Sequence, residues 1–282
     1  MDKKWTAVIK PKKKMLDLNL KEVYKYRDLI WLFVQRDIKT RYKQTILGPL
    51  WFVIQPLLTS VIHTLVFGTI AGIAPGGVPQ YLFYLAGSIS WGLFSGCLTT
   101  TSNTFVGNAS VFGKVYFPRL TTPIATVITQ MFNFIIQFAI FLLMSLIFFL
   151  SGATFQITWA AALLPILMLQ MALLGMGFGI IISSLTTKYR DLQVLVGFGI
   201  QLWMYITPVV YSANSIGGKL YTAMMINPVS SIVEIFKYGW LGGSAGSLPW
   251  LYWGISWIMT FVVLFIGVIL FNKTEKNFMD TV

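Results

Sequence analysis

Charged residues are scarce in this sequence. Asp, Glu, Lys and Arg make up 11% of its 282 residues, against the roughly 25% of an average soluble domain. The charges that exist lie at the ends of long uncharged runs, at 44–113, 120–187, 192–218 and 238–272. This distribution excludes a soluble globular protein, and it excludes a nucleic-acid-binding face despite the formal net charge of +12. Uncharged runs of this length indicate a membrane protein.

Residues that could carry chemistry are equally few. The sequence contains one His and one Cys, His63 and Cys97. Together they cannot form a metal site, and a single Cys excludes an intrachain disulfide, so Cys97 is interpreted as a small packing residue. The predicted spans around His63 lack a carboxylate, which excludes a Ser/His/Asp triad there. We interpret His63 as a hydrogen-bonding residue rather than a proton relay, and we expect that the chain is not an enzyme.

A nucleotide-binding motor is also missing. A P-loop requires Ser or Thr directly after its Gly-Lys pair, but the pairs at 113–114 and 218–219 are followed by Val115 and Leu220. The predicted spans hold no Asp, Glu, Lys or Arg, and thus lack the intramembrane charges typical of ion-coupled transporters. The chain is therefore a passive conduit, an enzyme acting through its loops, or one subunit of a machine powered elsewhere. We expect no cofactor in this chain.

The uncharged runs predict six spans. A bilayer core about 30 Å thick takes roughly 20 helical residues, so each of the two longest runs must cross and return. Turn-forming residues mark the reversals, between Gly72 and Pro79 and near Gly152. Helix is expected because open strands leave backbone groups unsatisfied in lipid. The sequence thus predicts an all-α integral membrane protein with a transmembrane domain at 48–271 and spans at Gly48 to Ile70, Tyr81 to Ser102, Leu120 to Leu150, Ile157 to Ser183, Leu192 to Tyr211 and Pro249 to Phe271.

Basic residues give the orientation. With six spans, 19 of the 21 Lys and Arg residues lie on one side of the membrane, and Lys219 and Lys237 lie on the other. The positive-inside rule therefore predicts a multi-pass protein whose terminal segments, 1–47 and 272–282, are both cytoplasmic. The segment 1–47 has no apolar stretch followed by a cleavage site, so the first span is expected to direct insertion.

The N-terminal segment contains an amphipathic pattern. From Lys21 onward, apolar residues recur at spacings of three and four, with charged residues between them. The apolar positions are Val23, Tyr26, Ile30, Val34, Ile38 and Tyr42. The pattern predicts a helix lying in the membrane interface. Two roles stay open: a basic anchor on anionic lipid, and a docking surface for a cytoplasmic partner.

The connection at 212–248 is much longer than the other two external connections. A candidate N-cap at Ser230 precedes an apolar stretch that ends at Gly242. About a dozen helical residues cannot cross a bilayer, so we expect re-entrant or rim helices between spans five and six. Glu234 and Lys237, three residues apart, have the spacing of an ion pair. A gate and a static lid both fit this pattern.

Aromatic residues crowd the spans and their rims. Most aromatics at such positions belong to the lipid-facing belt or to helix packing. The alternative is a stacking surface for sugar rings, whose C–H faces lie flat on Trp and Tyr. The residues that we assign to such a channel are Trp51, Phe52, Trp91, Trp203, Tyr205 and Tyr211.

Several segments resemble the membrane subunit of polysaccharide and O-antigen ABC exporters. Residues 36–51 (RDIKTRYKQTILGPLW) are similar to the start of that subunit, and 112–119 (FGKVYFPR) to its cytoplasmic segment between spans two and three. Residues 189–192 (YRDL) and 207–211 (TPVVY) match the region around the fifth span, and Asn227-Pro228 matches the rim helices. The match covers nearly the whole chain in order. The chain is identified as a member of this permease family.

The resemblance implies a homodimer in the bacterial inner membrane, with two separate ATP-binding subunits that hold ATP and magnesium. The dimer would move a lipid-linked glycan to the far side. The implied ATPase-coupling residues are Arg36, Asp37, Arg41, Asn108, Val111, Phe112, Lys114, Phe117 and Arg119. The implied outer gate contains Asn227, Glu234, Phe236 and Lys237.

The segment from Asn108 to Arg119 is apolar for a cytoplasmic connection, so it needs a surface to bury against. If that surface is an ATPase groove, we expect Phe112 to plug it and Lys114 to set the orientation. Two alternatives stay open for the whole protein. One is a permease for teichoic-acid-type polymers or another export substrate, and the other is a membrane glycan ligase or polymerase.

Overall fold

The computed structural model describes residues 20–42, 48, 50–73, 76–115, 117–189 and 191–281, with side chains at 20, 21, 41, 42 and 276–281 excepted. Within these residues every regular element is a helix. Part of the predicted N-terminal segment and the side chain of Arg41 lie outside the described residues.

Five helical stretches are long and apolar enough to cross a membrane. The first, Leu50–Ile70, joins α3 (Leu50–His63) to a π-helical turn, η1 (Thr64–Ile70). The others are α4 (Gln80–Ser102), α7 (Thr121–Leu150), η2 with α8 (Trp159–Leu163 and Leu164–Thr186), and α12 (Trp250–Thr281). These confirm five of the predicted spans.

The predicted fifth span is shorter than expected. α9 (Leu192–Ile206) has 15 residues, which reach about 22 Å at 1.5 Å per residue. Thr207 leaves the helix in an extended conformation. Pro208 follows it, and the residue before a proline disfavours the α region. Residues 207–211 therefore form turns and bends after α9 and are not part of the helix.

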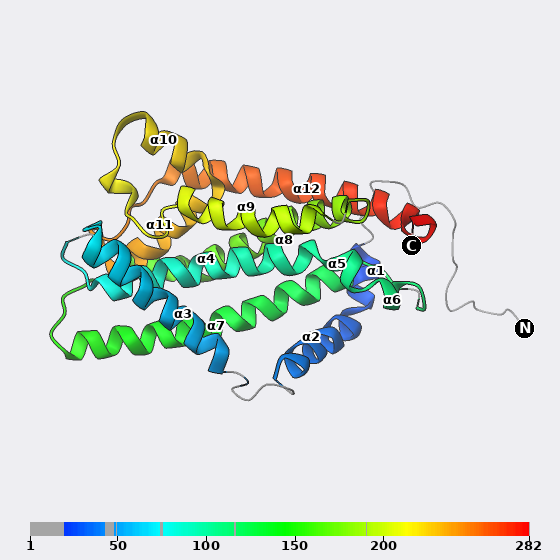
Figure 1. Ribbon diagram of the computed structural model, residues 1–282, viewed down its shortest axis with the longest axis horizontal. Helices are drawn as coiled ribbons and strands as arrows, with labels where there is room; N and C mark the ends of the chain where they lie inside the picture. Colours follow the sequence, from blue (N-terminus) through cyan, green and yellow to red (C-terminus); the bar gives the residue numbers. More distant parts are fainter. Residues whose placement is uncertain are drawn as a thin grey trace, which may run out of the picture.

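The long helices run roughly parallel along the longest axis of the molecule (Figure 1). α4 lies at the centre and packs against α3, α7, α8 and α11 (Pro228–Leu241). Glycines allow the helices to approach closely. A Cβ on Gly175 of α8 would lie 2.7 Å from the Phe94 carbonyl oxygen, and one on Gly267 of α12 would lie 2.9 Å from the Gly177 oxygen. Cys97 is buried in this packing as a free thiol, which confirms its predicted role.

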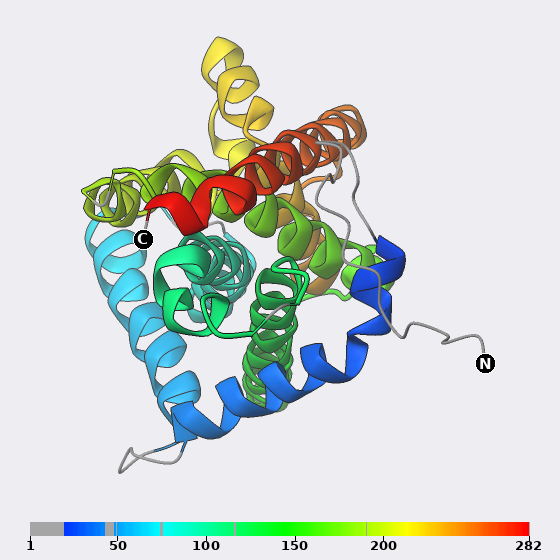
Figure 2. The ribbon, with the colours of Figure 1, turned by 90° about the vertical axis from the view of Figure 1, so that its right-hand side faces the viewer.

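The N-terminal helices α1 (Leu20–Lys25) and α2 (Arg27–Tyr42) lie across one end of the bundle (Figure 2). α2 packs against α7. Val23 and Val34 of the predicted apolar side are buried, whereas Lys25, Asp28 and Lys39 are exposed. The predicted division into an apolar and a charged side is therefore present, and the apolar side contacts the protein itself.

The long connection before α12 folds into η3 (Ala213–Ser215), α10 (Gly218–Ile226) and α11. The predicted N-cap at Ser230 is wrong. Asn227 caps α11 by accepting from the Val229 N–H at 3.2 Å, and Pro228, whose fixed φ suits the first helical position, begins the helix. α11 ends where predicted, at Gly242, whose φ of 95° suits glycine alone. Sequence reasoning did not predict α10.

Candidate functional site

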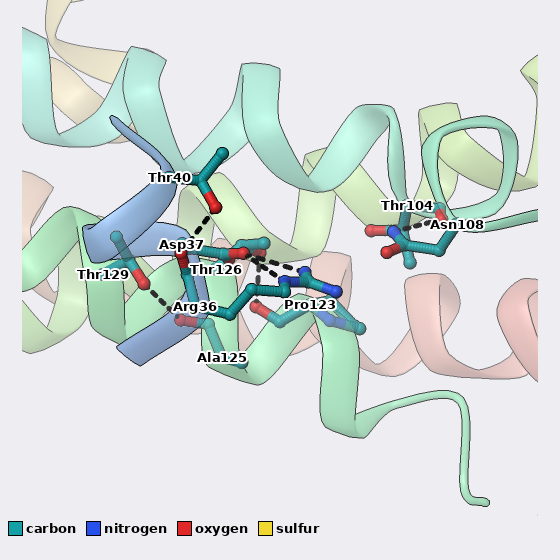
Figure 3. Close-up of polar contacts among 9 residues, drawn as sticks. All are labelled: Arg36, Asp37, Thr40, Thr104, Asn108, Pro123, Ala125, Thr126 and Thr129. Atoms are coloured by element: carbon teal, nitrogen blue, oxygen red, sulfur yellow. Dashed lines mark hydrogen bonds and ion pairs between the residues drawn. The ribbon is translucent and has the colours of Figure 1, made fainter. Parts of the chain in front are cut away.

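The predicted coupling residues of α2 form a local pair on its surface. The Arg36 guanidinium donates to Asp37 Oδ1 at 3.0 Å and 2.8 Å, and Thr40 Oγ1 donates to the Arg36 carbonyl (Figure 3). Arg36 also lies 4.8 Å above the Phe33 ring. A half-exposed pair of this kind contributes little to stability. The pair lies on the surface of α2.

An aromatic chain connects α2 to the end of α12. Phe33 of α2 lies 5.6 Å from Phe117, Phe117 lies 5.7 Å from Phe112, and Phe112 lies 6.1 Å from Phe105, with ring centroids as the reference. Phe105 stacks on Phe271 at 4.5 Å. The cluster therefore packs α2, the connection between α4 and α7, and α12 against one another, although these three segments are distant in sequence.

Phe112 does not project from the surface, as a residue that fills a groove of an ATPase subunit would. Only 3% of its surface is exposed, because it packs inside the aromatic chain of its own subunit. Among the described residues from Asn108 to Arg119, the exposed large apolar side chain is Val115, at 60%. Phe117 is buried like Phe112, and Val111 is half-buried. The expectation that Phe112 enters an ATPase groove therefore does not fit this geometry, and Val115 takes its place on the surface.

The polar members of the connection have different roles. Asn108 donates from its side chain to the Thr104 carbonyl at 2.9 Å, which stabilises the turn between α5 (Thr104–Gly107) and α6 (Ala109–Phe112) (Figure 3). Lys114 is exposed. Arg119 lies 5.4 Å above the Phe112 ring and donates to the Glu275 carbonyl at 3.0 Å. Burial lowers the pKa of Arg119, and the attraction of Glu275 opposes that shift.

At the other end of the molecule, Lys237 of α11 is fully buried. Its ammonium donates to the carbonyls of Pro208, Val209 and Tyr211 at 2.6, 3.0 and 3.2 Å. It also lies 3.8 Å above the Phe83 ring of α4. These carbonyls belong to the stretch that leaves α9, where no helix satisfies them. One lysine therefore supplies the hydrogen bonds that the broken helix lacks.

Glu234 holds the far end of the same stretch. Its carboxylate accepts from the Ala213 N–H at 3.1 Å and from Ser247 Oγ at 3.3 Å. The predicted ion pair with Lys237 is therefore not a direct contact, because each side chain reaches a different part of the backbone. Burial raises the pKa of Glu234, whereas attraction to Lys237 lowers it. Burial lowers the pKa of Lys237, and Glu234 opposes that shift.

Asn227 ties the end of α9 to the start of α11. Besides capping α11, its Oδ1 accepts from the Trp203 indole at 3.1 Å, and its Nδ2 donates to Thr207 Oγ1 at 2.8 Å. Phe236, the remaining predicted gate residue, is buried against Phe138 and Phe141 of α7. The four predicted gate residues thus form one region, and each connects α11 to another element.

The predicted channel residues divide into two groups. Trp91 is buried against Phe94, and Trp203 packs edge-on to Phe94 and Phe178 in addition to its bond with Asn227. Phe52 is half-buried. Tyr211 is half-buried and donates to the Tyr205 carbonyl at 3.2 Å. Of the six predicted channel residues, Trp51 and Tyr205 are the exposed ones, at 51% and 53%.

These two exposed rings lie on the two least buried spans. α3 and α9 lie along the same edge of the bundle (Figure 2). No residue of α9 is buried, and α3 buries three. Their exposed apolar side chains are Leu50, Trp51, Leu58, Val61, Ile62, Val194, Leu195, Phe198, Leu202, Tyr205 and Ile206.

Sequence reasoning missed one polar network. Gln170 of α8 donates to Ser256 and accepts from the Trp253 indole, and Ser256 donates to the Pro228 carbonyl at 2.6 Å. Gln and Ser inside an uncharged run were a signal for this network, but its partners are far apart in sequence. His63, in contrast, lies 3.4 Å from Ser88 Oγ, which agrees with its predicted role as a hydrogen-bonding residue. Groups of acidic, His and Cys residues that could hold a metal ion are not found among the described residues.

Comparison with known proteins identifies the family. The family described as ABC-2 type transporter matches residues 28–241. The O-antigen export system permease protein RfbA of Klebsiella pneumoniae is 28% identical over 254 residues, which are 90% of this chain and 94% of that protein. A protein of the same name from Myxococcus xanthus is 26% identical, over 77% of this chain and 82% of that protein. The polysialic acid transport protein KpsM of Escherichia coli is 26% identical, over 86% and 91%. The chain belongs to the ABC-2 type transporter family.

Proposed function

We propose that this chain is the permease subunit of an ABC exporter that moves a lipid-linked, O-antigen-like polysaccharide out across the bacterial inner membrane. Its relatives over nine-tenths of its length are named as O-antigen export permeases. ATP is hydrolysed by separate ATP-binding subunits, because the sequence contains no P-loop. The chain itself has no catalytic role in this proposal.

One observation carries the proposal most directly, the exposed apolar edge formed by α3 and α9. Uncharged helices exposed on one side suit either lipid or a second copy of the same edge. In a homodimer, two such edges enclose a passage that Trp51 and Tyr205 line with stacking surfaces for sugar rings. A chain of rings slides along such walls without a tight binding site.

In this proposal the membrane contains six spans. α9 is the fifth, extended by residues 207–211, and both termini are cytoplasmic because the basic residues lie on that side. α2 and the connection at 104–119 then face the cytoplasm, where the ATP-binding subunits dock. Lys114, Val115 and the Arg36–Asp37 pair provide exposed contacts there. In this proposal, a movement of α2 or of the connection caused by the ATP-binding subunits is transmitted to the spans through the aromatic chain.

The faces of α3 and α9 contain no Lys or Arg, which favours a neutral glycan over a polymer with many phosphates. A teichoic-acid-type polymer would require basic groups along its path. The ligase and polymerase alternatives are weaker still, because the external connections offer only Glu234, Lys219 and Lys237. Two of these three are buried and bonded to the backbone.

The test is purification of the tagged full chain from its native membrane in mild detergent. The proposal expects two ATP-binding subunits per two permease chains, together with ATPase activity that requires the complex. Deletion of the gene should leave the lipid-linked glycan inside the cell. Recovery of the chain without any ATPase, with normal glycan export in the deletion strain, would overturn the proposal.

A further inference from the structure

A cleft of about 450 Å³ opens at the C-terminal end of α7. Its walls are Leu142, Ser145, Leu146 and Phe149 of α7, Phe155 and Ile157 of the following turn, and Trp240 of α11. The α7 residues share one helix face because they are three, four and seven positions apart. The volume lies in the range of sites that hold a small apolar molecule.

Ser145 is the unexplained group in this cleft. The residue is nine-tenths buried, and its buried hydroxyl oxygen has no hydrogen-bond partner. Thr126 and Thr129, earlier on the same helix, donate to the carbonyls of Pro123 and Ala125. A buried hydroxyl without a partner is unfavourable, so this site suits a ligand that carries an acceptor.

The depth of the cleft indicates which ligand. Ser145 lies five residues before the end of α7, roughly 7 to 8 Å along the helix. Trp159, which begins η2 two residues after the cleft residue Ile157, stacks on Trp250 at the start of α12 at 5.7 Å, and both rings are exposed. Exposed Trp residues at span ends mark the level of lipid headgroups. The hydroxyl therefore lies just below that level, where glycerol esters give way to hydrocarbon.

We propose that this cleft binds one acyl chain of a glycerophospholipid, whose ester carbonyl accepts a hydrogen bond from Ser145. The acyl chain contacts the apolar walls of the cleft, and the Ser145 hydroxyl donates to the ester carbonyl, which is the first polar group along that chain. An isoprenoid chain fits less well, because it offers no acceptor below its phosphate. The inference rests on α7 spanning the membrane and not on the identity of the exported cargo.

The lipid acyl chain bound in the cleft also supports the outer end of the protein. Trp240 forms one wall of the cleft and belongs to α11, which carries Asn227, Glu234 and Lys237. Thr158, directly after the cleft residue Ile157, donates to the Gly239 and Tyr238 carbonyls at 2.8 Å and 3.1 Å. A lipid in the cleft thus packs between the outer end of α7 and the helix that holds the broken end of α9.

The experiment is photolabelling of the full chain in vesicles of phosphatidylethanolamine and phosphatidylglycerol. A few mole percent of the phosphatidylethanolamine carries a diazirine in one acyl chain, and adducts are mapped by peptide mass spectrometry. We expect adducts concentrated on residues 142–157 and on the peptide of Trp240. Because the probe enters both leaflets and neither ATP nor glycan is present, the result does not depend on transport.

Two variants and one matched control complete the test. Leu146→Trp fills the cleft and should lower labelling roughly tenfold, whereas Leu143→Trp should leave it unchanged, since Leu143 is equally exposed on the same helix but outside the cleft. Ser145→Ala should lower labelling about two- to tenfold, the value of one hydrogen bond. It should not lower the amount of assembled protein, since it removes an unpaired hydroxyl.

Labelling spread evenly over lipid-facing helices, or unchanged in both Leu146→Trp and Ser145→Ala, would show ordinary surrounding lipid only and overturn the proposal. Labelling of the same peptides by a diazirine polyprenyl phosphate, with none by the phospholipid probe, would overturn it in favour of the isoprenoid. If the Leu146→Trp protein does not assemble, the change in photolabelling of the Ser145→Ala protein alone supports or overturns the proposal.

Discussion

Lys237 carries a buried charge whose partners are three backbone carbonyls and an aromatic ring. The three carbonyls would otherwise be unsatisfied, because the chain has left α9 and has not yet entered α10. Burial of a lysine is costly unless every donor is used. Here the bonds to the 208–211 stretch and the charge of Glu234 offset that cost. The residue therefore determines the path of the chain more than it stabilises α11 itself.

Replacement of Lys237 tests this role. Lys237→Met keeps the length of the side chain but removes its charge and donors, and it leaves Glu234 charged and buried. We expect a loss of about 3 to 5 kcal/mol in stability. The measurement is the thermal midpoint of the full chain in detergent, by fluorescence-detected gel filtration. Lys219→Met, at an exposed position on α10, is the control and should have no effect.

The double variant Glu234→Gln with Lys237→Met should recover part of the loss, because no charge then remains buried. An unchanged midpoint in Lys237→Met would mean that the 208–211 carbonyls are satisfied by other donors.

Trp203 and Tyr205 offer a second test at the residue scale. Trp203→Ala removes a packed ring and the bond to Asn227, so it should cost about 3 to 5 kcal/mol and lower the amount of assembled protein. Tyr205→Ala removes an exposed ring and should leave assembly intact while it reduces glycan export. Quantitative blotting of the membrane fraction, compared with surface glycan, separates the two. Export that falls only in proportion to protein for Tyr205→Ala would argue against a stacking role.

At the scale of elements, the connection between α4 and α7 uses some residues for packing inside the bundle and others for its exposed surface. Phe112 and Phe117 build the aromatic chain that fixes the connection to α2 and α12. Lys114 and Val115 remain at the surface. The connection is therefore packed on its inner side and exposed on its outer side, as the proposed docking of an ATP-binding subunit requires.

Variants in the connection should separate these two roles. Phe112→Ala is expected to cost about 3 to 5 kcal/mol and to lower assembly, whereas Val115→Asp should leave assembly unchanged and weaken co-purification of the ATPase subunits. The readouts are gel filtration of the full chain and the ATPase recovered per permease. Lys114→Ala should have a milder effect than Val115→Asp. A Val115→Asp complex that retains its ATPase would place the docking surface elsewhere.

The sequence patterns predicted which helices exist more accurately than they predicted where the helices end and which side chains they bring together. Uncharged runs indicated all five long spans, because lipid excludes charge along the entire length of a helix. The end of α9 was placed too late, since residues 207–211 are as apolar as the helix that they leave. The burial of Phe112 depends on α12 returning to the same place, and the acceptors of Lys237 lie nearly 30 positions away. Neither follows from local spacing.

At the scale of the whole molecule, the turn before α4 and the turn before α12 lie together at one end of the bundle. A Cβ on Gly77, in the turn before α4, would lie 3.9 Å from Ser244 Oγ, in the turn before α12. The basic connection at 104–119 lies at the other end of the bundle (Figure 1). The fold thus has two chemically different ends, with charge and docking groups at one and a buried polar network at the other.

Cysteine labelling tests this polarity. In a Cys97→Ser background, Gly76→Cys and Ser244→Cys should react in intact cells with a thiol reagent that cannot cross the membrane, whereas Ser110→Cys should react only after lysis. Gly76 is chosen over Gly77 because its φ is ordinary and a side chain there meets no atom within 4 Å. Reaction of Ser110→Cys in intact cells, with Ser244→Cys protected, would invert the orientation.

The central position of α4 has a consequence for synthesis in the cell. α4 is the most buried of the five long spans and the least apolar. It is the second span in chain order, yet α8 and α11, which cover it, follow in the sequence. During translation, α4 is therefore inserted before the helices that cover it exist. Until α8 has been synthesised, we expect the serines, threonines and glycines of α4 to be exposed to lipid or to the insertion machinery. Nascent chains that stop before α8 should be the ones that membrane quality-control proteases remove.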